Sequence, residues 1–388
     1  MIFRTIHLVQ MRIGVDIRPF LSRETGVGTY LKNLLFHLAR MDRVNEYHLF
    51  SSSWKERFPS EKIPPFVKSR FRDLRIPVRA TNFLWYGLGW PSLDSFFGAK
   101  LDLTHSPTPL ALPTGGKRIV TVYDPFFLDQ PGKADKQARD VFSKKAGKSL
   151  ANADGILTIS EFTRRALLER FSLDEARIKV TPLGLNPLFF EDAPAEVLEA
   201  TRRKYALPEK FLLFVGAVEF RKNLVTLVKA LARVHEAGEK IVLVVAGRTG
   251  EDSANLDEAA ARLGLGDWVR RLGYLPDSEV RDLYRLACIF VFPSLCEGFG
   301  LPLLEAMACG LAAAVSRVGA LPEVGGEAAA YFDPTDPYDI AGVLLELLED
   351  SAKRRELVEN GIRRSALFRW EMTARETLTF YEKVAGAR

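Results

Sequence analysis

Two carboxylate residues, Glu297 and Glu305, lie in the segment VFPSLCEGFGLPLLEAMACG in the second half of the chain. The pattern predicts a buried strand before them and a helix after them, with Pro302 at the first helical position. The glycines of EGFG leave backbone N–H groups unpaired at the helix N-terminus, which suits an anion. Helical side chains lean toward that end, so Glu305 can reach the same ligand as Glu297. The segment indicates a sugar-diphosphate pocket; a capped helix carrying a surface acid is the alternative.

A second segment, FVGAVEFRKNLVTLVKAL, places Arg221 and Lys222 directly after a predicted strand that ends near Gly216. A guanidinium can bind a phosphate through two hydrogen bonds, and an ammonium adds a point charge. Departure of a nucleoside diphosphate requires this charge compensation, which fixed cations supply without a metal. An Arg–Lys dipeptide is more often a solvated pair without a ligand, but not where it follows the end of a strand.

Other polar or glycine residues also follow predicted strands, at the edge where parallel sheets bind their ligands. A Gly-x-Gly turn between the first strand and the first helix is weak evidence, since a tight turn without a ligand has the same pattern. His105 lies near another strand end, and a structural role is the more frequent one for a lone histidine. The ligand-facing candidates at these ends are Gly26, Gly28, Tyr123, Asp124, Ser160, Glu161, Gly273 and Tyr274.

Several classes of protein are disfavoured by what the sequence lacks. There is no Asp-x-Asp pair, so we expect no metal site, and no complete dinucleotide fingerprint, which disfavours hydride transfer. The three cysteines, Cys288, Cys296 and Cys309, have no zinc-type or disulfide-type spacing, and we expect reduced, mostly buried thiols. Apolar runs are far shorter than the roughly 20 residues that cross a bilayer. The N-terminus resembles no signal peptide, so we expect a cytoplasmic protein.

The positive charge of the chain is concentrated in its first half. Residues 1–190 hold 29 Lys and Arg against 18 Asp and Glu, whereas residues 191–388 hold 25 against 31. No recognition-helix, zinc-finger or RNA-platform signature accompanies this charge, so nucleic acid is not an expected partner. The stretch 66–90 places five Lys and Arg before a segment rich in Trp and Phe. It suits a peripheral contact with an anionic membrane, and equally a solvated basic face before a core helix.

Two domains are expected, because 388 residues with 47% hydrophobic content exceed one ordinary core. Short β-rich runs alternate with helix-like segments in two series, which is the pattern of α/β domains with parallel sheets. A Pro-bearing stretch between Thr181 and Leu207 marks the boundary. We therefore predict an N-terminal domain over 1–190, joined by a C-terminal helix at about 372–388, and a C-terminal domain over 191–371. The two Rossmann-like sheets would face each other across a ligand cleft.

Taken together, these segments resemble the retaining GT-B glycosyltransferases of family 4 along nearly the whole chain from Met11. The RKN loop and the glutamate segment are the most specific parts of the resemblance. It is carried by GVGTY, TVYDPFF, TISEFTRR, VTPLGLNPLF, GAVEFRKNL, LGYLPDSEVRDLY, PSLCEGFGLPLLEAMACG, ALPEVGG and FRWEMTARETLTFYEKV.

The resemblance implies a role for each matched residue. Arg221 and Lys222 would hold the donor diphosphate, Glu297 the sugar hydroxyls and Glu305 the nucleotide ribose. Phe299 and Gly300 would offer backbone contacts, Gly273 and Tyr274 would lie near the base, and Gly26 and Gly28 would close over the phosphates from the first domain. The C-terminal helix would cross back to the first domain. The full set of expected donor-site residues is Gly26, Gly28, Gly216, Arg221, Lys222, Gly273, Tyr274, Glu297, Gly298, Phe299, Gly300, Leu301 and Glu305, with Tyr123 and Asp124 added to Arg221, Lys222 and Glu297 as catalytic candidates.

One position departs from the family: many relatives carry histidine where this chain has Tyr123. A phenol with an ordinary pKa of about 10 is a poor base at neutral pH, although it can donate a hydrogen bond. Catalysis would then rest on stabilising the leaving group and on positioning, in a front-face retaining reaction whose departing phosphate oxygen takes the acceptor's proton.

The expected function is transfer of a hexosyl unit from a nucleoside-diphosphate sugar to a glycan or lipid-linked acceptor in surface polysaccharide synthesis. Resemblance to bacterial mannosyltransferases favours GDP-mannose over a UDP-sugar; both are substrates, and no cofactor is expected. Two alternatives stay open: a sugar-nucleotide epimerase on the same scaffold, which the two glutamates oppose, and a non-catalytic sugar-nucleotide-binding protein, which the loss of the histidine would suit.

Overall fold

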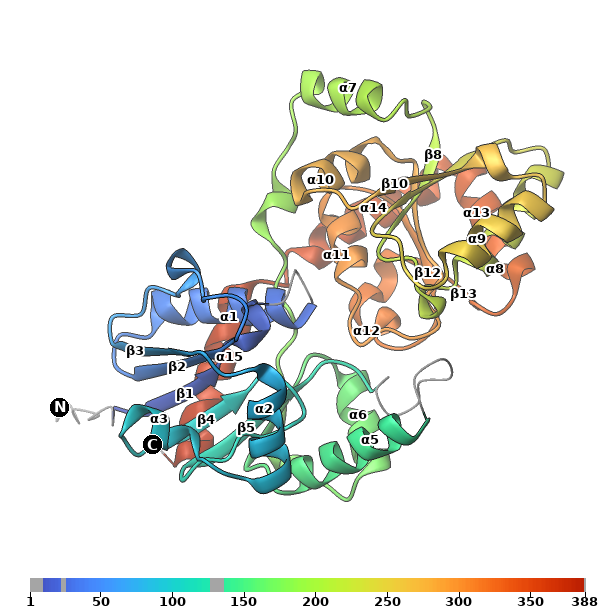
Figure 1. Cartoon of the computed structure of the whole chain (residues 1–388). Coiled ribbons are helices and arrows are strands. Elements are labelled where there is room, and N and C mark those ends of the chain that lie inside the picture. The colour runs from blue at the N-terminus through green and yellow to red at the C-terminus, as the bar shows by residue number, and fades with distance from the viewer. Residues whose placement is uncertain (1–9, 22–25, 126–135, 387–388) are drawn as a thin grey trace. The chain divides into compact units, whose positions relative to one another are not determined.

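The structure, a computed structural model, describes residues 10–21, 26–125 and 136–386, and it divides into two compact units. Unit 1 contains the chain up to Gly184 together with the segment from Arg369 onward, and unit 2 runs from Leu185 to Phe368. Figure 1 shows the α/β character of each. The 47% hydrophobic content thus fills two cores, as expected for a chain of this length.

Unit 1 is built on a seven-stranded parallel sheet in the order β3-β2-β1-β4-β5-β6-β7. β1 pairs with β2 on one side and β4 on the other, with Val15 aligned to Leu49 and to His105. The helix α15 packs beside α1 (Figure 1). The elements of unit 1 are β1 (Arg12–Asp16), η1 (Arg18–Phe20), α1 (Gly26–Met41), β2 (Glu46–Ser52), η2 (Ser60–Lys62), β3 (Ser69–Leu74), α2 (Val78–Phe83), η3 (Leu84–Leu88), α3 (Leu93–Phe97), β4 (Leu103–Ser106), β5 (Lys117–Val122), α5 (Lys136–Ala151), β6 (Gly155–Thr158), α6 (Glu161–Arg170), η4 (Glu175–Arg177), β7 (Ile178–Val180) and α15 (Trp370–Ala385).

Unit 2 contains a six-stranded parallel sheet in the order β10-β9-β8-β11-β12-β13. The central strands are continuous apolar runs, as strands covered on both faces require, and all residues of β9 and β11 are buried. The elements of unit 2 are η5 (Pro187–Phe190), α7 (Ala195–Lys204), β8 (Phe211–Val215), η6 (Phe220–Lys222), α8 (Leu224–Glu236), β9 (Val242–Ala246), α9 (Ser253–Arg262), η7 (Gly266–Trp268), β10 (Val269–Gly273), α10 (Asp277–Leu286), β11 (Ile289–Phe292), α11 (Leu301–Ala308), β12 (Ala313–Ser316), α12 (Leu321–Gly325), η8 (Gly326–Ala328), β13 (Ala330–Phe332), α13 (Pro337–Glu349) and α14 (Ser351–Ser365).

The sequence pattern missed three strands, β3, β12 and β13. β3, with the sequence SRFRDL, lies at the edge of its sheet and its burial is low, so it carries no apolar run. β12 and β13 are only four and three residues long, and half of β12 is alanine, which has low strand propensity. All three are recognised only by their pairing with a neighbouring strand.

Candidate active site

The predicted cationic loop and the predicted glutamate loop of unit 2 leave adjacent strands, β8 and β11. Strand order runs from β8 through β9 to β10 on one side and from β11 through β12 to β13 on the other. The order therefore reverses between β8 and β11, which is where open parallel sheets bind ligands beyond their carboxyl ends. Arg221 and Lys222 follow β8, and Glu297 follows β11.

An ion pair joins the two loops. The ammonium Nζ of Lys222 donates to Oε1 of Glu297 at 2.5 Å, and Nη1 of Arg221 donates to the same oxygen at 3.2 Å. Arg221 also donates through Nε to Glu219. The side chains of Lys222 and Glu297 are only 8% and 10% exposed, so water screens their attraction little. Residues predicted in two separate segments of the sequence thus form one charged cluster.

Asn223 fixes the cationic loop against the glutamate loop. Its backbone is left-handed, with φ 58°, and it caps α8. Its Nδ2 donates to the carbonyls of Pro293 and Pro334, and the N–H of Leu295 donates to the carbonyl of Arg221. Asparagine tolerates the left-handed region better than most residues, because its side chain bonds locally. These bonds hold the charges of the cluster in position before any ligand arrives.

Opposing forces set the ionisation of this cluster. Burial alone would raise the pKa of Glu297, but the charges of Lys222 and Arg221 outweigh it and hold that pKa below its ordinary value. Burial lowers the pKa of Lys222, and the Glu297 carboxylate opposes part of that decrease. Lys222 also lies over the ring of Phe292, 4.5 Å from its centroid. The cluster offers a buried ammonium and a half-buried guanidinium for an anion, and a carboxylate oxygen for hydroxyl groups.

The glutamate loop has glycine neighbours that sequence reasoning did not single out. A Cβ on Gly319, whose φ is 64°, would lie 2.5 Å from the carbonyl oxygen of Glu297. The N–H of Ala320 donates to that same carbonyl at 2.9 Å. Gly319 therefore lets a neighbouring loop pack directly on the backbone of Glu297. In the sequence, Gly319 is one of several glycines in the segment SRVGALPEVGG, and a single glycine there does not indicate a contact with Glu297.

The helix α11 follows the EGFG glycines as expected, but it begins one residue earlier than predicted. Gly300 is its N-cap, with φ 103°, and a Cβ there would lie 2.5 Å from Leu321. Leu301 is the first helical residue, so Pro302 is second, and the expectation of proline at the first position was wrong by one. Proline tolerates either place, because no helical bond needs its N–H there.

Glu305 stands apart from the ion-pair cluster. Its Oε2 accepts a hydrogen bond from the hydroxyl of Tyr284 on α10 at 3.0 Å, and no hydrogen bond or ion pair links Glu305 to Lys222 or Glu297 in the described part of the chain. Burial raises the pKa of Glu305 to about 7, and the Tyr284 hydrogen bond opposes that rise. Tyr284 is fully buried. It was not predicted as a partner of Glu305, because a single tyrosine in an amphipathic helix is usually interpreted as a core residue.

The other donor-site candidates of unit 2 lie on the same strand ends, and no contact tests their roles. Gly216 and Gly273 have positive φ values of 150° and 75° after β8 and at the end of β10. Tyr274 is exposed. Gly298 is buried, Leu301 is half-buried, and the Phe299 ring is buried against Phe368. Their assignment to the donor remains a prediction.

Unit 1 carries a buried charge pair at its own point of strand reversal, between β1 and β4. Arg18, just after β1, donates through Nε and Nη2 to the two oxygens of Asp16 at 2.9 and 2.7 Å. Its Nη1 donates to Thr81 and Asn82, and its guanidinium lies 4.6 Å from the Trp85 ring centroid. Sequence reasoning did not select this pair, whose Asp-x-Arg spacing is too common to be a signal.

Tyr123 and Asp124 follow β5, at the same edge as Asp16. The Tyr123 hydroxyl donates to the carbonyl of Pro107 at 3.3 Å, and its ring meets Tyr30 edge to face. Burial raises the pKa of Tyr123 well above its ordinary value, so this phenol is no base at neutral pH. Gly26 and Gly28 form the first turn of α1. Part of the adjacent loop, residues 22–25, lies outside the described residues.

Several other expectations have structural outcomes. Ser160, one of the ligand-facing candidates, is the N-cap of α6, and its side chain accepts a hydrogen bond from the N–H of Thr163. His105 is fully buried between the hydroxyls of Thr121 and Tyr381, and burial lowers its pKa to about 3, so its role is structural. The three cysteines are thiols and not disulfides; Cys309 is buried, whereas Cys288 and Cys296 are half-buried, so the expectation of mostly buried thiols holds for one of the three.

The described ranges contain no group of three His, Cys, Asp or Glu side chains that could hold a metal ion. Across those same ranges, every helix is too short or too polar to cross a membrane.

Residues 25–187 match the family described as Glycosyltransferase Family 4, and residues 198–364 match the family Glycosyl transferases group 1. The chain is 30% identical to the O-antigen chain mannosyltransferase B of Escherichia coli over 380 residues, covering 96% of this chain and all of that one.

Two solved structures share the fold. Sucrose-phosphate synthase from Thermosynechococcus elongatus superposes with a TM-score of 0.75 at 21% identity, covering 98% of this chain and 100% of the other. The Anabaena protein HepE, solved with UDP-glucose, superposes with a TM-score of 0.72 at 15% identity, covering 97% and 100%. Two parallel-sheet units of this kind are the GT-B fold.

Proposed function

Since the chain belongs to glycosyltransferase family 4, we propose that it transfers a hexosyl unit, with mannose favoured, from a nucleoside-diphosphate sugar to a glycan or lipid-linked acceptor. The configuration at the sugar's anomeric carbon would be retained, and surface polysaccharide synthesis is the proposed setting. The reaction would take place on the cytoplasmic side, with the enzyme in peripheral contact with the membrane. The relative named O-antigen chain mannosyltransferase B supports the sugar and the setting.

The observation that carries the proposal is the joining of Arg221, Lys222 and Glu297 at the strand reversal of unit 2. Two cations held at one point, one of them buried and the other half-buried, are what a diphosphate needs. Charge that develops on a leaving phosphate is stabilised most by groups that are already in place and need not reorganise. Glu297, between the two cations, is placed to accept hydrogen bonds from sugar hydroxyls while its charge stays compensated.

The proposed chemistry needs no enzyme nucleophile. The bond between the anomeric carbon and the diphosphate breaks toward Arg221 and Lys222, the acceptor oxygen attacks from the same face, and its proton passes to the departing phosphate oxygen. We also propose that no metal takes part, since the two side-chain cations supply the positive charge. Tyr123 and Asp124 would contribute positioning, because the Tyr123 hydroxyl is already bonded to Pro107.

Glu305 is proposed to accept hydrogen bonds from the ribose of the donor, as its counterparts do by family resemblance. Its place on α11, whose N-terminus follows Gly300, puts it on the element that would receive the diphosphate. The remaining assignments, Gly26 and Gly28 to the phosphates and Gly273 and Tyr274 to the base, rest on the same resemblance. GDP-mannose is the first candidate donor and a UDP-sugar the second.

The test is a donor screen with the purified full-length chain. Thermal unfolding is measured with GDP, UDP, ADP and their sugars, because a ligand that binds only the folded state raises the unfolding midpoint by mass action. Release of nucleoside diphosphate is then followed with the stabilising donor, with and without EDTA, and the product's anomeric configuration is read by NMR. Arg233→Ala is the matched control, since Arg233 forms an exposed ion pair with Glu236 on α8.

The expected result is stabilisation by one sugar nucleotide and slow release of its diphosphate that EDTA does not change. Both should be lost in Lys222→Ala and kept in Arg233→Ala. Tight binding without release would instead indicate a non-catalytic binding protein, and recovery of an altered sugar nucleotide would indicate an epimerase. Stabilisation by no sugar nucleotide would contradict the proposal.

A further inference from the structure

Three large apolar side chains stand out from one short segment of unit 1. Phe83 at the end of α2, Leu88 at the end of η3 and Trp90 just beyond are 66%, 64% and 68% exposed. Isolated exposed apolar residues are ordinary, but three within eight positions of one segment are the pattern of an interaction surface. We call these three side chains the apolar ridge.

The ridge lies on one continuous helical segment. α2 continues directly into η3, one turn of π-helix. Phe83 ends α2 and Leu88 ends η3, and both side chains are exposed. Trp85, between them, points inward: it is buried, its ring packs on Phe50, and its Nε1 donates to the carbonyl of Pro91 at 2.9 Å. The buried Trp85 thus fixes this segment to the body of unit 1, while the ridge side chains remain exposed.

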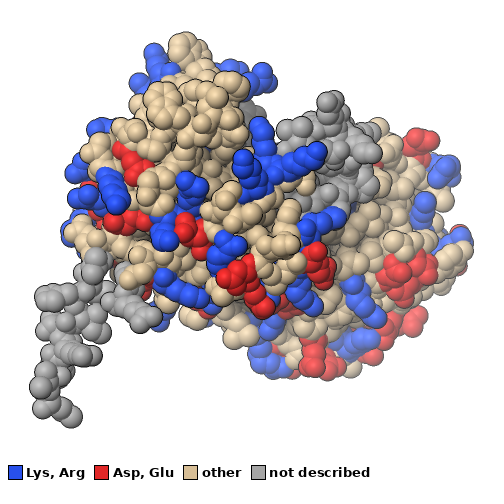
Figure 2. Space-filling model, turned by 90° about the horizontal axis from the view of Figure 1, so that it is seen from below, with Lys and Arg blue, Asp and Glu red and all other residues tan. Residues whose placement is uncertain are grey.

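Arginines beside the ridge are exposed and without ion pairs. Arg79 lies one helical turn before Phe83, and Arg72 and Arg75 precede α2; the described residues provide none of these three with a hydrogen-bond or ion-pair partner. The two earlier cations of the same stretch differ, since Arg70 pairs with Glu46 and Lys68 donates to the carbonyl of Val44. Figure 2 shows an uncharged projection bordered by blue side chains on the face seen from below.

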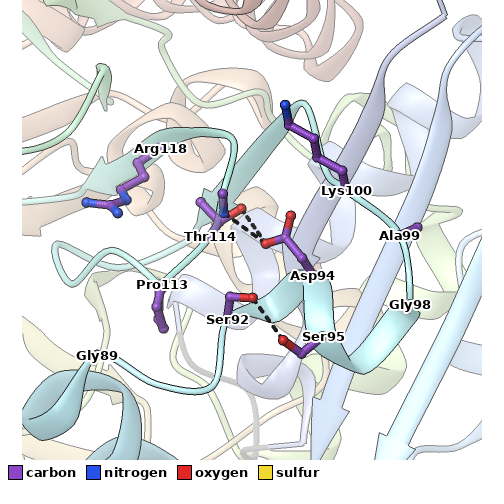
Figure 3. A pocket seen from close by; sticks show the side chains of 11 residues that line it. Gly89, Ser92, Asp94, Ser95, Gly98, Ala99, Lys100, Pro113, Thr114 and Arg118 are labelled. Carbon is purple, nitrogen blue, oxygen red and sulfur yellow. Dashed lines mark hydrogen bonds between the residues drawn. The ribbon is translucent and has the colours of Figure 1, made fainter.

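A shallow hollow of about 620 Å³ continues this surface from Gly89, next to Trp90. Lys100 and Arg118 line it on either side of Asp94 and Thr114 (Figure 3). The Asp94 carboxylate is already held by Thr114 and by the N–H groups of Leu101 and Gly115, whereas neither cation is paired within the described residues. The hollow lies at the amino ends of β4 and β5, whereas Asp16 and Tyr123 lie at the carboxyl ends of strands of the same sheet.

We propose that the apolar ridge, with Arg79, Lys100 and Arg118 around it, is the surface by which this chain binds an anionic lipid bilayer. Trp, Phe and Leu enter the boundary between headgroups and acyl chains, while guanidinium and ammonium groups stay at the phosphates. Each cation near a bilayer surface adds to the attraction. The proposal deepens the peripheral membrane contact of the proposed function by naming the residues that make it.

Chemistry favours a bilayer over a protein partner for this surface. Its apolar part consists of only three exposed side chains, of types that insert into the lipid interface, and its charge has one dominant sign. A protein interface of ordinary size would need a broader apolar centre with polar groups that find specific partners. The described ridge and its cations have the features of a lipid-binding surface and not those of such an interface.

The experiment measures flotation of the full-length chain with two kinds of vesicle. One contains phosphatidylcholine alone, and the other contains roughly a third phosphatidylglycerol. The key variant is Phe83→Ser/Leu88→Ser/Trp90→Ser. Trp90→Ser is compared with Trp54→Ser, since Trp54 is 66% exposed but follows the carboxyl end of β2. A third variant, Arg79→Gln/Lys100→Gln/Arg118→Gln, removes charge only. All substituted side chains lie at the surface, and unfolding midpoints verify that each variant folds.

The wild-type chain should float with the anionic vesicles and not with neutral ones. The ridge variant should bind at least about tenfold more weakly, because the buried apolar area is lost, and the charge variant should lose about fivefold per cation. Trp54→Ser should bind like the wild type. Equal binding to both vesicle types, unchanged binding of the ridge variant, or no binding at all would overturn the proposal, and the last result would leave a protein partner for the ridge.

Donor-dependent release of nucleoside diphosphate is measured on the same variants in the absence of vesicles. The ridge belongs to unit 1 and the Lys222–Glu297 cluster to unit 2, so this activity should be unchanged. Loss of vesicle binding with intact donor chemistry separates failure of the membrane surface from failure of the proposed transferase reaction.

Discussion

The ammonium of Lys222 donates to the carboxylate of Glu297 across 75 positions of sequence, and both side chains are about nine-tenths buried. A pair of this kind is costly to break, because removing one member leaves the other charged and poorly solvated. It also defines the point on the sheet of unit 2 where the two loops of the candidate site meet.

Removing either member of this pair should destabilise the fold. Lys222→Met and Glu297→Gln are each expected to lower the unfolding free energy by about 3 kcal/mol, since one buried charge is left without its partner. The double variant should lose less than the sum, because neither charge is then stranded. Thermal unfolding of the three variants measures this. Additive losses would show that the two side chains do not act as a pair.

Turnover should depend on the two cations far more than on Tyr123. Arg221→Ala and Lys222→Ala are expected to lower kcat by about 10²–10³, the effect of removing a preorganised charge from a reacting site. Tyr123→Phe should keep more than about a tenth of the wild-type rate, since its hydroxyl is bonded to Pro107 and contributes positioning at most. Diphosphate release under saturating donor measures all three. A loss in Tyr123→Phe as large as in Lys222→Ala would give the phenol a direct catalytic role.

Glu305 should make stability decrease as pH rises. Its pKa is about 7 in the folded chain against 4.5 ordinarily, so below 4.5 the group is protonated in both states and has no effect. Between 4.5 and 7 the unfolded state releases the proton and the folded state keeps it, which costs up to about 1.4 kcal/mol per pH unit. Above 7 the loss is complete.

Glu305→Gln should therefore gain stability relative to the wild type between pH 5 and pH 8, by about 2 kcal/mol. Unfolding midpoints of both proteins across this range provide the measurement. Glu258→Gln, at an exposed position on α9, is the control and should follow the wild type. Parallel curves for Glu305→Gln and the wild type would mean that Glu305 ionises in the folded chain as it does in water.

The C-terminal helix should be tied to the sheet of unit 1 by the buried His105. The hydroxyl of Tyr381 on α15 is 2.6 Å from Nδ1 of His105, whose Nε2 is 2.7 Å from the Thr121 hydroxyl. Tyr381→Phe leaves a buried ring nitrogen without a partner, at a cost of about 1–3 kcal/mol. Thermal unfolding against Tyr338→Phe, an exposed tyrosine of α13, tests this. Equal midpoints for the two variants would show that the hydrogen bond contributes nothing.

The sequence by itself determined the local features of this protein. Alternating apolar runs and helix-like segments established two α/β units, because each element forms from residues close in the chain. The RKN and EGFG segments were found as loops after strands for the same reason. Short strands such as β13 were missed, since only pairing with a neighbour makes them strands.

The tertiary structure decided which of these local features meet. Strand order is a long-range property, and it alone put the loops after β8 and β11 side by side, so that Lys222 and Glu297 pair. It also gave Glu305 its partner Tyr284 instead of that cluster, and made His105 a structural residue. Residue type and spacing along a chain fix what a side chain can do; burial and distant partners, which exist only after folding, set its charge and its neighbours.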